Sequence, residues 1–207
     1  MRVIHLAAAL VALAQPGAGA GQTFPPWSEP RILAEINRAR ANPAAYAEEL
    51  RVYRSGFEGA IVRIPGNPAL VRTREGVAAV DDAIRFLEAQ PALPPLAESA
   101  RLTLAAADHV ADQGPRGLEG HGGSNGSTSA TRIRRRGGAR SATVAEAITY
   151  GSANPAGIVR QLIIDDGVPQ RGHRTLLFST TYRSAGGACG PHARHSSMCV
   201  IDLSSAP

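Results

Sequence analysis

The sequence predicts one α+β domain in which helices and strands pack in layers. Helical patterns occupy the first part of the chain, and strand patterns appear later, interleaved with further helices. Regular strand–helix–strand units and internal repeats are both missing from this order. The 207 residues give room for a single domain with a sizeable core, which we assign to residues 31–207.

The amino-terminal 20 residues have the pattern of a secretory signal peptide. Arg2 supplies a positive start, residues 3–14 are mostly apolar, and residues 18–20 are small enough for a cleavage site. This apolar run is too short to span a bilayer as a helix, and we expect no transmembrane segment elsewhere. The predicted product is exported to the periplasm or the extracellular space, with residues 21–30 as an extended lead-in.

Six segments have helical spacing of apolar residues. The first begins at Pro30, with Ser28 or Glu29 before it, and runs to about residue 40 with a face made of Ile32, Leu33, Ile36 and Ala39. Asn42 and Pro43 interrupt it, and a second helix follows over residues 44–52. The other predicted helices cover residues 77–89, 98–113, 129–136 and 155–165.

Three segments are predicted as strands, at residues 143–150, 184–189 and 198–203. Residues 191–197 would connect the last two into a hairpin. Glycine and proline make residues 55–75 a loop, with a short extended piece at 60–64. Residues 114–126 form a second, glycine-rich loop.

The chain has two cysteines, Cys189 and Cys199, one beside each strand of the expected hairpin. Export favours a disulfide, which would stabilise the hairpin by roughly 2–3 kcal/mol. The alternative is a metal site formed with His192 and His195, although the cysteines of zinc sites are normally two to four residues apart.

All 22 basic residues are arginine, and the net charge is +5. They are densest at Arg132, Arg134, Arg135, Arg136 and Arg140. This cluster is either a patch for anionic surfaces or simply a solvated helix face. Aromatic residues make up only 4% of the chain, so we expect no specific binding of nucleic acid.

Two histidines and three acidic residues are the candidates for chemistry. His121 lies in the glycine-rich loop, whereas His109 lies on the apolar stripe of a helix and is expected to be a packed side chain. Glu146 shares a strand face with Val144 and Ile148, so its carboxylate needs a partner, such as a nearby arginine or a site.

Asp165 and Asp166 end a helix, where negative charge opposes the helix dipole. We expect Arg171, Arg174 or a cation to compensate them, and His173 follows in the same segment. Two histidines and two acids brought together would make a metal site or an acid–base site. Ser124, Asp166 and His173 also follow the chain order of a hydrolase triad, but no buried strand precedes Ser124, so we do not expect a triad.

Three motifs together resemble the CAP superfamily, also called the SCP domain, over residues 32–203. These are residues 120–127, the segment around Glu146, and residues 165–174. The resemblance implies a three-layer α-β-α sandwich with a central antiparallel sheet, and a cleft lined by two histidines and two acids. The histidines fall on His121 and His173, the first acid on Glu146, and the second acid best on Asp166, with Asp165 as the alternative.

The chain departs from the family pattern at two positions. The family usually has Glu at the second acid, where this chain has Asp, and an Asn after the first acid, where it has Ala147. The family's histidine pair can bind zinc or another divalent metal, so we expect such a metal and no organic cofactor.

The resemblance indicates a monomeric binding module, without enzymatic activity, for a lipid, an envelope component or a protein partner. The alternative is a metal-dependent hydrolase of the same cleft with Glu146 as its base. A third hypothesis is a cationic interaction protein that acts through residues 132–140.

Overall fold

The computed structural model describes residues 29–64, 70–152 and 154–206. The expected signal peptide, and the lead-in up to residue 28, lie outside this part. In chain order the elements are α1 (Glu29–Ala41), α2 (Pro43–Arg54), β1 (Phe57–Glu58), β2 (Ile61–Arg63), β3 (Leu70–Arg72), α3 (Val77–Ala89), β4 (Ala97–Glu98), α4 (Ala100–Gln113), α5 (Ser129–Arg135), β5 (Val144–Tyr150), α6 (Pro155–Ile164), the 3-10 turn η1 (Pro169–Arg171), α7 (Gly172–Leu177), β6 (Ser184–His192) and β7 (Ser196–Ser204).

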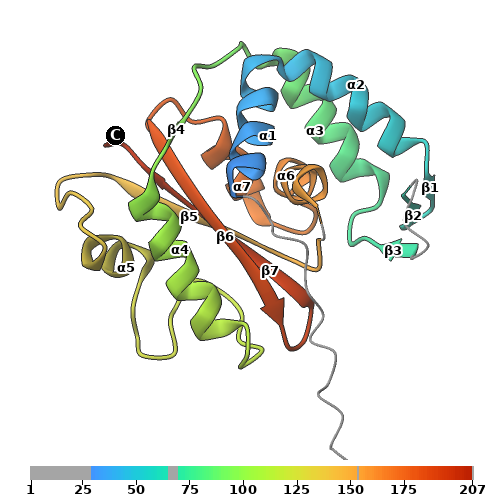
Figure 1. The fold of residues 1–207 in the computed structure, drawn as a ribbon. Coiled ribbons are helices and arrows are strands. Elements are labelled where there is room, and N and C mark those ends of the chain that lie inside the picture. The colour runs from blue at the N-terminus through green and yellow to red at the C-terminus, as the bar shows by residue number, and fades with distance from the viewer. Residues whose placement is uncertain (1–28, 65–69, 153, 207) are drawn as a thin grey trace, which may run out of the picture.

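A four-stranded sheet with the order β4-β6-β7-β5 forms the middle layer (Figure 1). Strands β5, β7 and β6 are antiparallel, and only the two-residue edge strand β4 pairs in parallel with β6. Helices α4 and α5 cover one face, and α1, α3 and α6 lie on the other. The α+β class and the three-layer sandwich are therefore confirmed, with one short parallel pair added to the antiparallel sheet.

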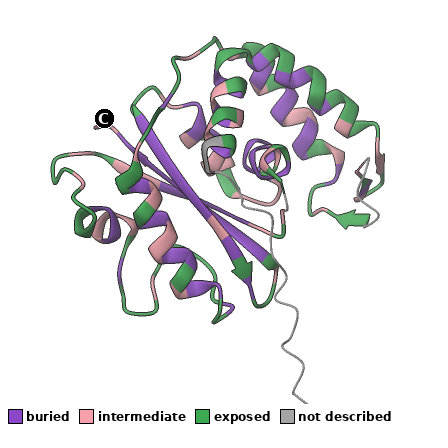
Figure 2. Cartoon of the chain, in the orientation of Figure 1, coloured by how far each residue is buried: buried purple, intermediate pink, exposed green. Residues whose placement is uncertain are grey.

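The alternation of side chains along the strands divides the core into two faces. In β5, Ala145 and Ala147 pack with the helices around α1 and α6, whereas Val144 and Ile148 pack toward α4 and α5. The strands are buried over most of their length, as Figure 2 shows. Any polar side chain at an even-numbered position of β5 is therefore enclosed between the sheet and the α4–α5 layer.

Helix α4 approaches β6 closely at Gly186. A Cβ atom at this position would lie 2.3 Å from the backbone nitrogen of Thr103 and 2.7 Å from the carbonyl oxygen of Ser99. Glycine is therefore required for the start of α4 to lie directly on the sheet. This contact sets the position of α4, which carries several side chains that hold the candidate site.

The final hairpin is longer than the sequence predicts. Its strands extend to His192 and from Ser196, which leaves a three-residue turn in place of the expected loop at 191–197. The imidazole of His192 stabilises the turn, since its Nδ1 accepts hydrogen bonds from the amides of Arg194 and His195. Its Nε2 lies 2.9 Å from the carbonyl oxygen of Leu118.

Cys189 and Cys199 face each other across this hairpin and form the predicted disulfide. The alternative metal site with His192 and His195 is wrong, because both sulfurs are used in the disulfide. The small sheet β1-β2-β3 and helix α7 were not predicted, apart from the extended piece at 60–64. In the described ranges no helix has the length and apolar character needed to cross a membrane.

Candidate functional site

His121 and Glu146 form the first of two histidine–carboxylate pairs. His121 Nδ1 lies 2.9 Å from Glu146 Oε1, and the other carboxylate oxygen accepts a 2.5 Å hydrogen bond from Arg132. The Glu146 side chain is only 2% exposed, whereas the imidazole of His121 is 60% exposed. A buried ion pair between Glu146 and Arg132 thus supports an imidazole that faces solvent.

The electrostatics of this pair follow from its hydrogen bonds. Burial by itself would raise the pKa of Glu146, but the hydrogen bonds from His121 and Arg132 outweigh burial and lower that pKa. Glu146 is therefore ionised and can only accept, so His121 carries a proton on Nδ1. The hydrogen bond to Glu146 raises the pKa of His121. Among the residues that the structure describes, the Nε2 atom of His121 has no hydrogen-bond partner, so it can contact a ligand.

The loop that carries His121 is held by four side chains. His109 Nε2 and Gln113 Nε2, one turn apart on α4, bond to the carbonyl oxygens of Gly120 and Gly122 at 2.9 Å each. The hydroxyl of Tyr150 accepts from the amide of Gly120, and Arg132 donates to the carbonyl oxygen of His121. The position of His121 is thus set before any ligand arrives.

His109 is a packed histidine, in agreement with the prediction from the sequence. Its side chain is fully buried, and burial lowers its pKa. Because a carbonyl oxygen only accepts, His109 donates from Nε2 to Gly120, and its Nδ1 has no partner among the described residues. Its contact with Gly120 makes it a support for the loop of His121.

The second pair consists of His173 and Asp165. Asp165 Oδ1 lies 2.7 Å from His173 Nδ1, and Asp165 Oδ2 accepts a 2.8 Å hydrogen bond from the amide of His173. Asp165 is buried, and the His173 side chain is 20% exposed. The structure thus pairs His173 with Asp165, the alternative, rather than with the preferred Asp166.

Asp166 points to a different part of the chain. Its two oxygens accept hydrogen bonds from the amides of Arg74 and Glu75, at 2.7 and 2.8 Å. The reason for the exchange is that α6 ends at Ile164, one residue earlier than predicted, and Asp165 adopts a left-handed conformation with φ 57°. Because of this turn, the side chain of Asp165 points toward His173 and that of Asp166 points toward the loop before α3.

Strained backbone is concentrated in the segment that carries His173. Asp165, Gln170 and Arg171 all have positive φ values between 53° and 58°. Each costs energy that the surrounding contacts must offset. Arg171 donates to the carbonyl oxygen of Asp165, and Arg174 donates to those of Ile163 and Ile164. The two arginines thus satisfy carbonyl oxygens at the end of the helix, but the expectation that they pair with the two aspartates is wrong: Arg171 and Arg174 form ion pairs with Glu75 and Asp82 instead.

Each histidine is thus joined to its own carboxylate, but no hydrogen bond joins the two pairs among the residues that the structure describes. Glu146 lies on the sheet face toward α4 and α5, whereas Asp165 and His173 follow α6, which packs on the other face. Within residues 29–64, 70–152 and 154–206, no group of three or more His, Cys, Asp or Glu side chains is arranged to hold a metal ion. Metal binding by His121 and His173 stays a prediction.

Two buried residues beside the first pair, Arg132 and Asp202, were not identified from the sequence. Arg132 was assigned to a basic cluster at the surface, but its side chain is 4% exposed and bonds to Glu146. Asp202 lies opposite Glu146 in the strand register, is fully buried, and neither carboxylate oxygen has a partner among the described residues. Burial, followed by the nearby charge of Glu146, raises the pKa of Asp202 to about 8.

A signal for both residues was present in the sequence. The carboxylate of Glu146 required a partner such as an arginine. Asp202 lies two and four residues after Val200 and Met198, so it shares their buried strand face. The serine triad, by contrast, does not form. The hydroxyl of Ser124 donates to Asp112, and Asp166 bonds to the loop before α3.

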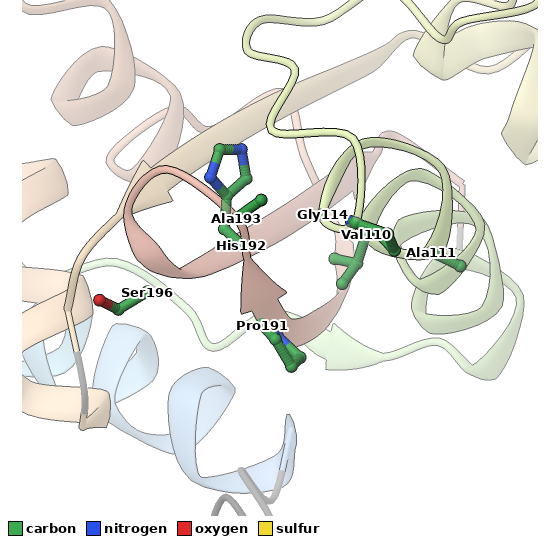
Figure 3. Close-up of a pocket in the computed structure, with 8 residues that line it drawn as sticks. Val110, Ala111, Gly114, Pro191, His192, Ala193 and Ser196 are labelled. Atoms are coloured by element: carbon green, nitrogen blue, oxygen red, sulfur yellow. The ribbon is translucent and has the colours of Figure 1, made fainter. Parts of the chain in front are cut away.

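A cavity of about 670 Å³ lies apart from both pairs, between the end of α4 and the β6–β7 turn (Figure 3). Val110, Ala111, Pro115, Pro191 and Ala193 make most of its lining apolar. His192 is the one ionisable residue in this lining, and both of its nitrogens are already used in hydrogen bonds. The cavity could therefore bind a ligand through apolar contacts, but its lining has no ionisable group that is available for acid–base chemistry.

No curated protein is similar enough to this sequence to be matched with it. Two solved structures are similar. One is an outer surface protein from Borrelia burgdorferi, with 16% identity, a TM-score of 0.46, and coverage of 62% of this chain and 89% of that chain. The other is an extracellular protein containing an SCP domain from Bacillus anthracis str. Ames, with 15% identity, a TM-score of 0.45, and coverage of 61% and 37%. The model of the cysteine-rich secretory protein family, CAP, matches residues 33–203, and the chain belongs to this family.

Proposed function

We propose that this chain is an exported CAP-domain binding module for a component of the cell envelope, with His121 as its ligand contact. The observation that carries the proposal is the supported and exposed imidazole. Arg132 and Glu146 are buried beside it, its loop is held by α4, and its side chain is 60% exposed. Such a rigid polar group binds a ligand without the entropy cost of ordering a loop.

The hydrogen bonding of both histidines supports binding rather than covalent catalysis. A nucleophilic serine or cysteine needs an adjacent base. Among the described residues, no serine, threonine or cysteine side chain is hydrogen-bonded to His121 or His173, and both cysteines are in the disulfide. Each imidazole instead uses Nδ1 for a carboxylate.

The test is a pull-down of purified protein with three separate probes: vesicles of phosphatidylglycerol and phosphatidylethanolamine, insoluble peptidoglycan, and a protein extract of the envelope. Binding to one of these that is lost in His121→Ala supports the proposal and identifies the class of ligand. The matched control is His195→Ala, a partly exposed histidine that also pairs with a carboxylate, Glu119. Equal loss in both variants, or no binding at all, would contradict the proposal.

A metal-dependent hydrolase is the second candidate. It is favoured by one observation: both histidines give Nδ1 to a buried carboxylate, which is how metal-ligating histidines are commonly oriented. Each Nε2 atom could donate to zinc, but the two pairs lie toward opposite faces of the sheet, and the described residues include no group of three possible metal ligands. A bound zinc ion would supply a Lewis acid, and the ionised Glu146 would orient the His121 imidazole through Nδ1.

Calorimetric titration with zinc tests the metal, and a peptide-substrate screen with and without a chelator tests the hydrolase. Zinc affinity that is unchanged in the His121→Ala, His173→Ala double variant would rule out this pair as the metal ligands. Cleavage that is abolished both by the chelator and by Glu146→Ala would favour the hydrolase over the binding module.

A further inference from the structure

A small polar cavity lies between α4, α5 and the loop that follows His121, and Arg132 is part of its lining. Its volume is about 300 Å³, at the lower end of the range for ligand sites. Six residues from three segments line it, and all are polar: Asp108, Asp112, Asn125, Ser127, Arg132 and Arg135. The two aspartates are one turn apart on α4, and Asn125 and Ser127 belong to the loop that follows His121.

Most charged groups of this cavity are already paired within the protein. Its two aspartates are ionised, because the hydrogen bond from Arg136 lowers the pKa of Asp108 and that from Ser124 lowers the pKa of Asp112. Arg132 is paired with Glu146, and Asp112 also accepts from Arg116, so Arg135 is the one charged side chain of the lining that makes no ion pair among the described residues. A simple anion would meet the carboxylates and a simple cation would meet the guanidinium groups. An apolar molecule would leave all of them desolvated without partners.

Several donors in the cavity have no partner. Arg132 is buried, and its Nε makes no hydrogen bond among the described residues. Within the same part of the chain, Arg135 makes no ion pair and the amide NH₂ of Asn125 makes no hydrogen bond; its Oδ1 accepts from the amide of Ser127. These donors share the lining of the cavity with Asp108 and Asp112, whose oxygens already accept one or two hydrogen bonds each and keep lone pairs for a further donor.

We infer that this cavity is a binding site for one unit of a neutral, hydroxyl-rich saccharide. A sugar hydroxyl both donates and accepts, so neighbouring hydroxyls can donate to Asp108 or Asp112 and accept from Arg132, Arg135 or Asn125. The lining has no aromatic ring to stack on, so the affinity of a single unit is weak. This site is separate from the His121 contact, and each can fail without the other.

The test is a titration of the full chain, observed by ¹H–¹⁵N NMR, with maltotriose and with triacetylchitotriose. At up to about 20 mM sugar we expect saturable shifts at the cavity residues with at least one of the two. Asn125→Asp keeps the oxygen that accepts from Ser127 and removes only the NH₂ donor, and Arg135→Ser removes an exposed guanidinium. Each is expected to weaken binding about fivefold, the effect of one hydrogen bond.

The matched control is Arg134→Ser, an exposed neighbour on α5 that does not line the cavity. Unchanged thermal unfolding of all three variants shows that the fold is kept. Equal weakening in Arg134→Ser, the absence of saturable shifts with both sugars, or salt-dependent binding of dextran sulfate alone would each overturn the assignment. His121→Ala is expected to keep sugar binding, which distinguishes failure of this site from failure of the envelope contact.

Discussion

At the scale of single residues, Glu146 organises the first histidine pair. Its carboxylate is taken out of water, which is costly unless each oxygen has a charged or polar partner. Arg132 satisfies one oxygen and His121 the other. Removing either partner would leave a buried charge, so the three side chains act as one unit.

Replacing Glu146 by Gln is expected to lower the pKa of His121, since the hydrogen bond to Glu146 is the main reason that this pKa is raised. The stabilisation that comes from His121 exists below its ordinary pKa, near 6.5, and is lost as the pH rises through its folded value. NMR titration of the imidazole measures the change. Glu119→Gln, which alters the partner of His195 and Arg194, should leave His121 unaffected. An unchanged His121 pKa in Glu146→Gln would contradict the assignment.

Asp202 also makes stability fall as the pH rises, but through a buried carboxyl group. Its folded pKa of about 8 lies far above the ordinary 3.8, so the native state holds a proton that the unfolded state has released. Between these values stability falls as the pH rises, by up to about 1.4 kcal/mol per unit. Asp202→Asn is expected to remove this loss and so to be more stabilising at pH 8 than at pH 4. Denaturant unfolding at both values measures the difference, and a variant with the same pH profile as the parent chain would refute it.

At the scale of elements, the segment after α6 is the part of the fold in which local conformation decides chemistry. Asp165 and Asp166 are adjacent, but one orients His173 and the other bonds to the amides of Arg74 and Glu75. Asp165 thus bonds within the strained segment, and Asp166 connects this segment to the loop before α3.

We expect Asp165→Asn and Asp166→Asn to be separable. Each change weakens charge-assisted hydrogen bonds and is expected to cost about 1–3 kcal/mol. The ¹⁵N shifts of the His173 ring should change in Asp165→Asn and stay as they are in Asp166→Asn. Equal changes in the ring shifts of both variants would contradict the pairing.

At the scale of the whole molecule, the disulfide joins the two central strands of the sheet, on which both helical layers pack. Replacing both cysteines by serine is expected to lower the free energy of unfolding by about 2–3 kcal/mol, chiefly because the unfolded chain gains freedom. Thermal unfolding of the double variant, compared with the oxidised parent chain, measures this. A loss below about 0.5 kcal/mol would show that the disulfide has no constraining role.

The long elements were predictable because their periodicity extends over several turns. Helix α3 matches its predicted bounds, and α4 differs by two residues at its start. Helix α7 has six residues and β4 has two, too few for a pattern to develop. The length of β6 and β7 depends on His192 stabilising the turn, which is a contact between the ends of two strands.

The sequence by itself determined the layered α+β class, the disulfide, and the choice of His121, His173 and Glu146 as the residues to examine. These follow from composition, periodicity and motifs, which are local along the chain. Only the tertiary structure decided that Asp165 rather than Asp166 bonds to His173. It also decided that Arg132, which belongs to the basic cluster in the sequence, is buried and pairs with Glu146. The physical reason is that adjacent residues of the same type differ only in the direction that the backbone and packing give them.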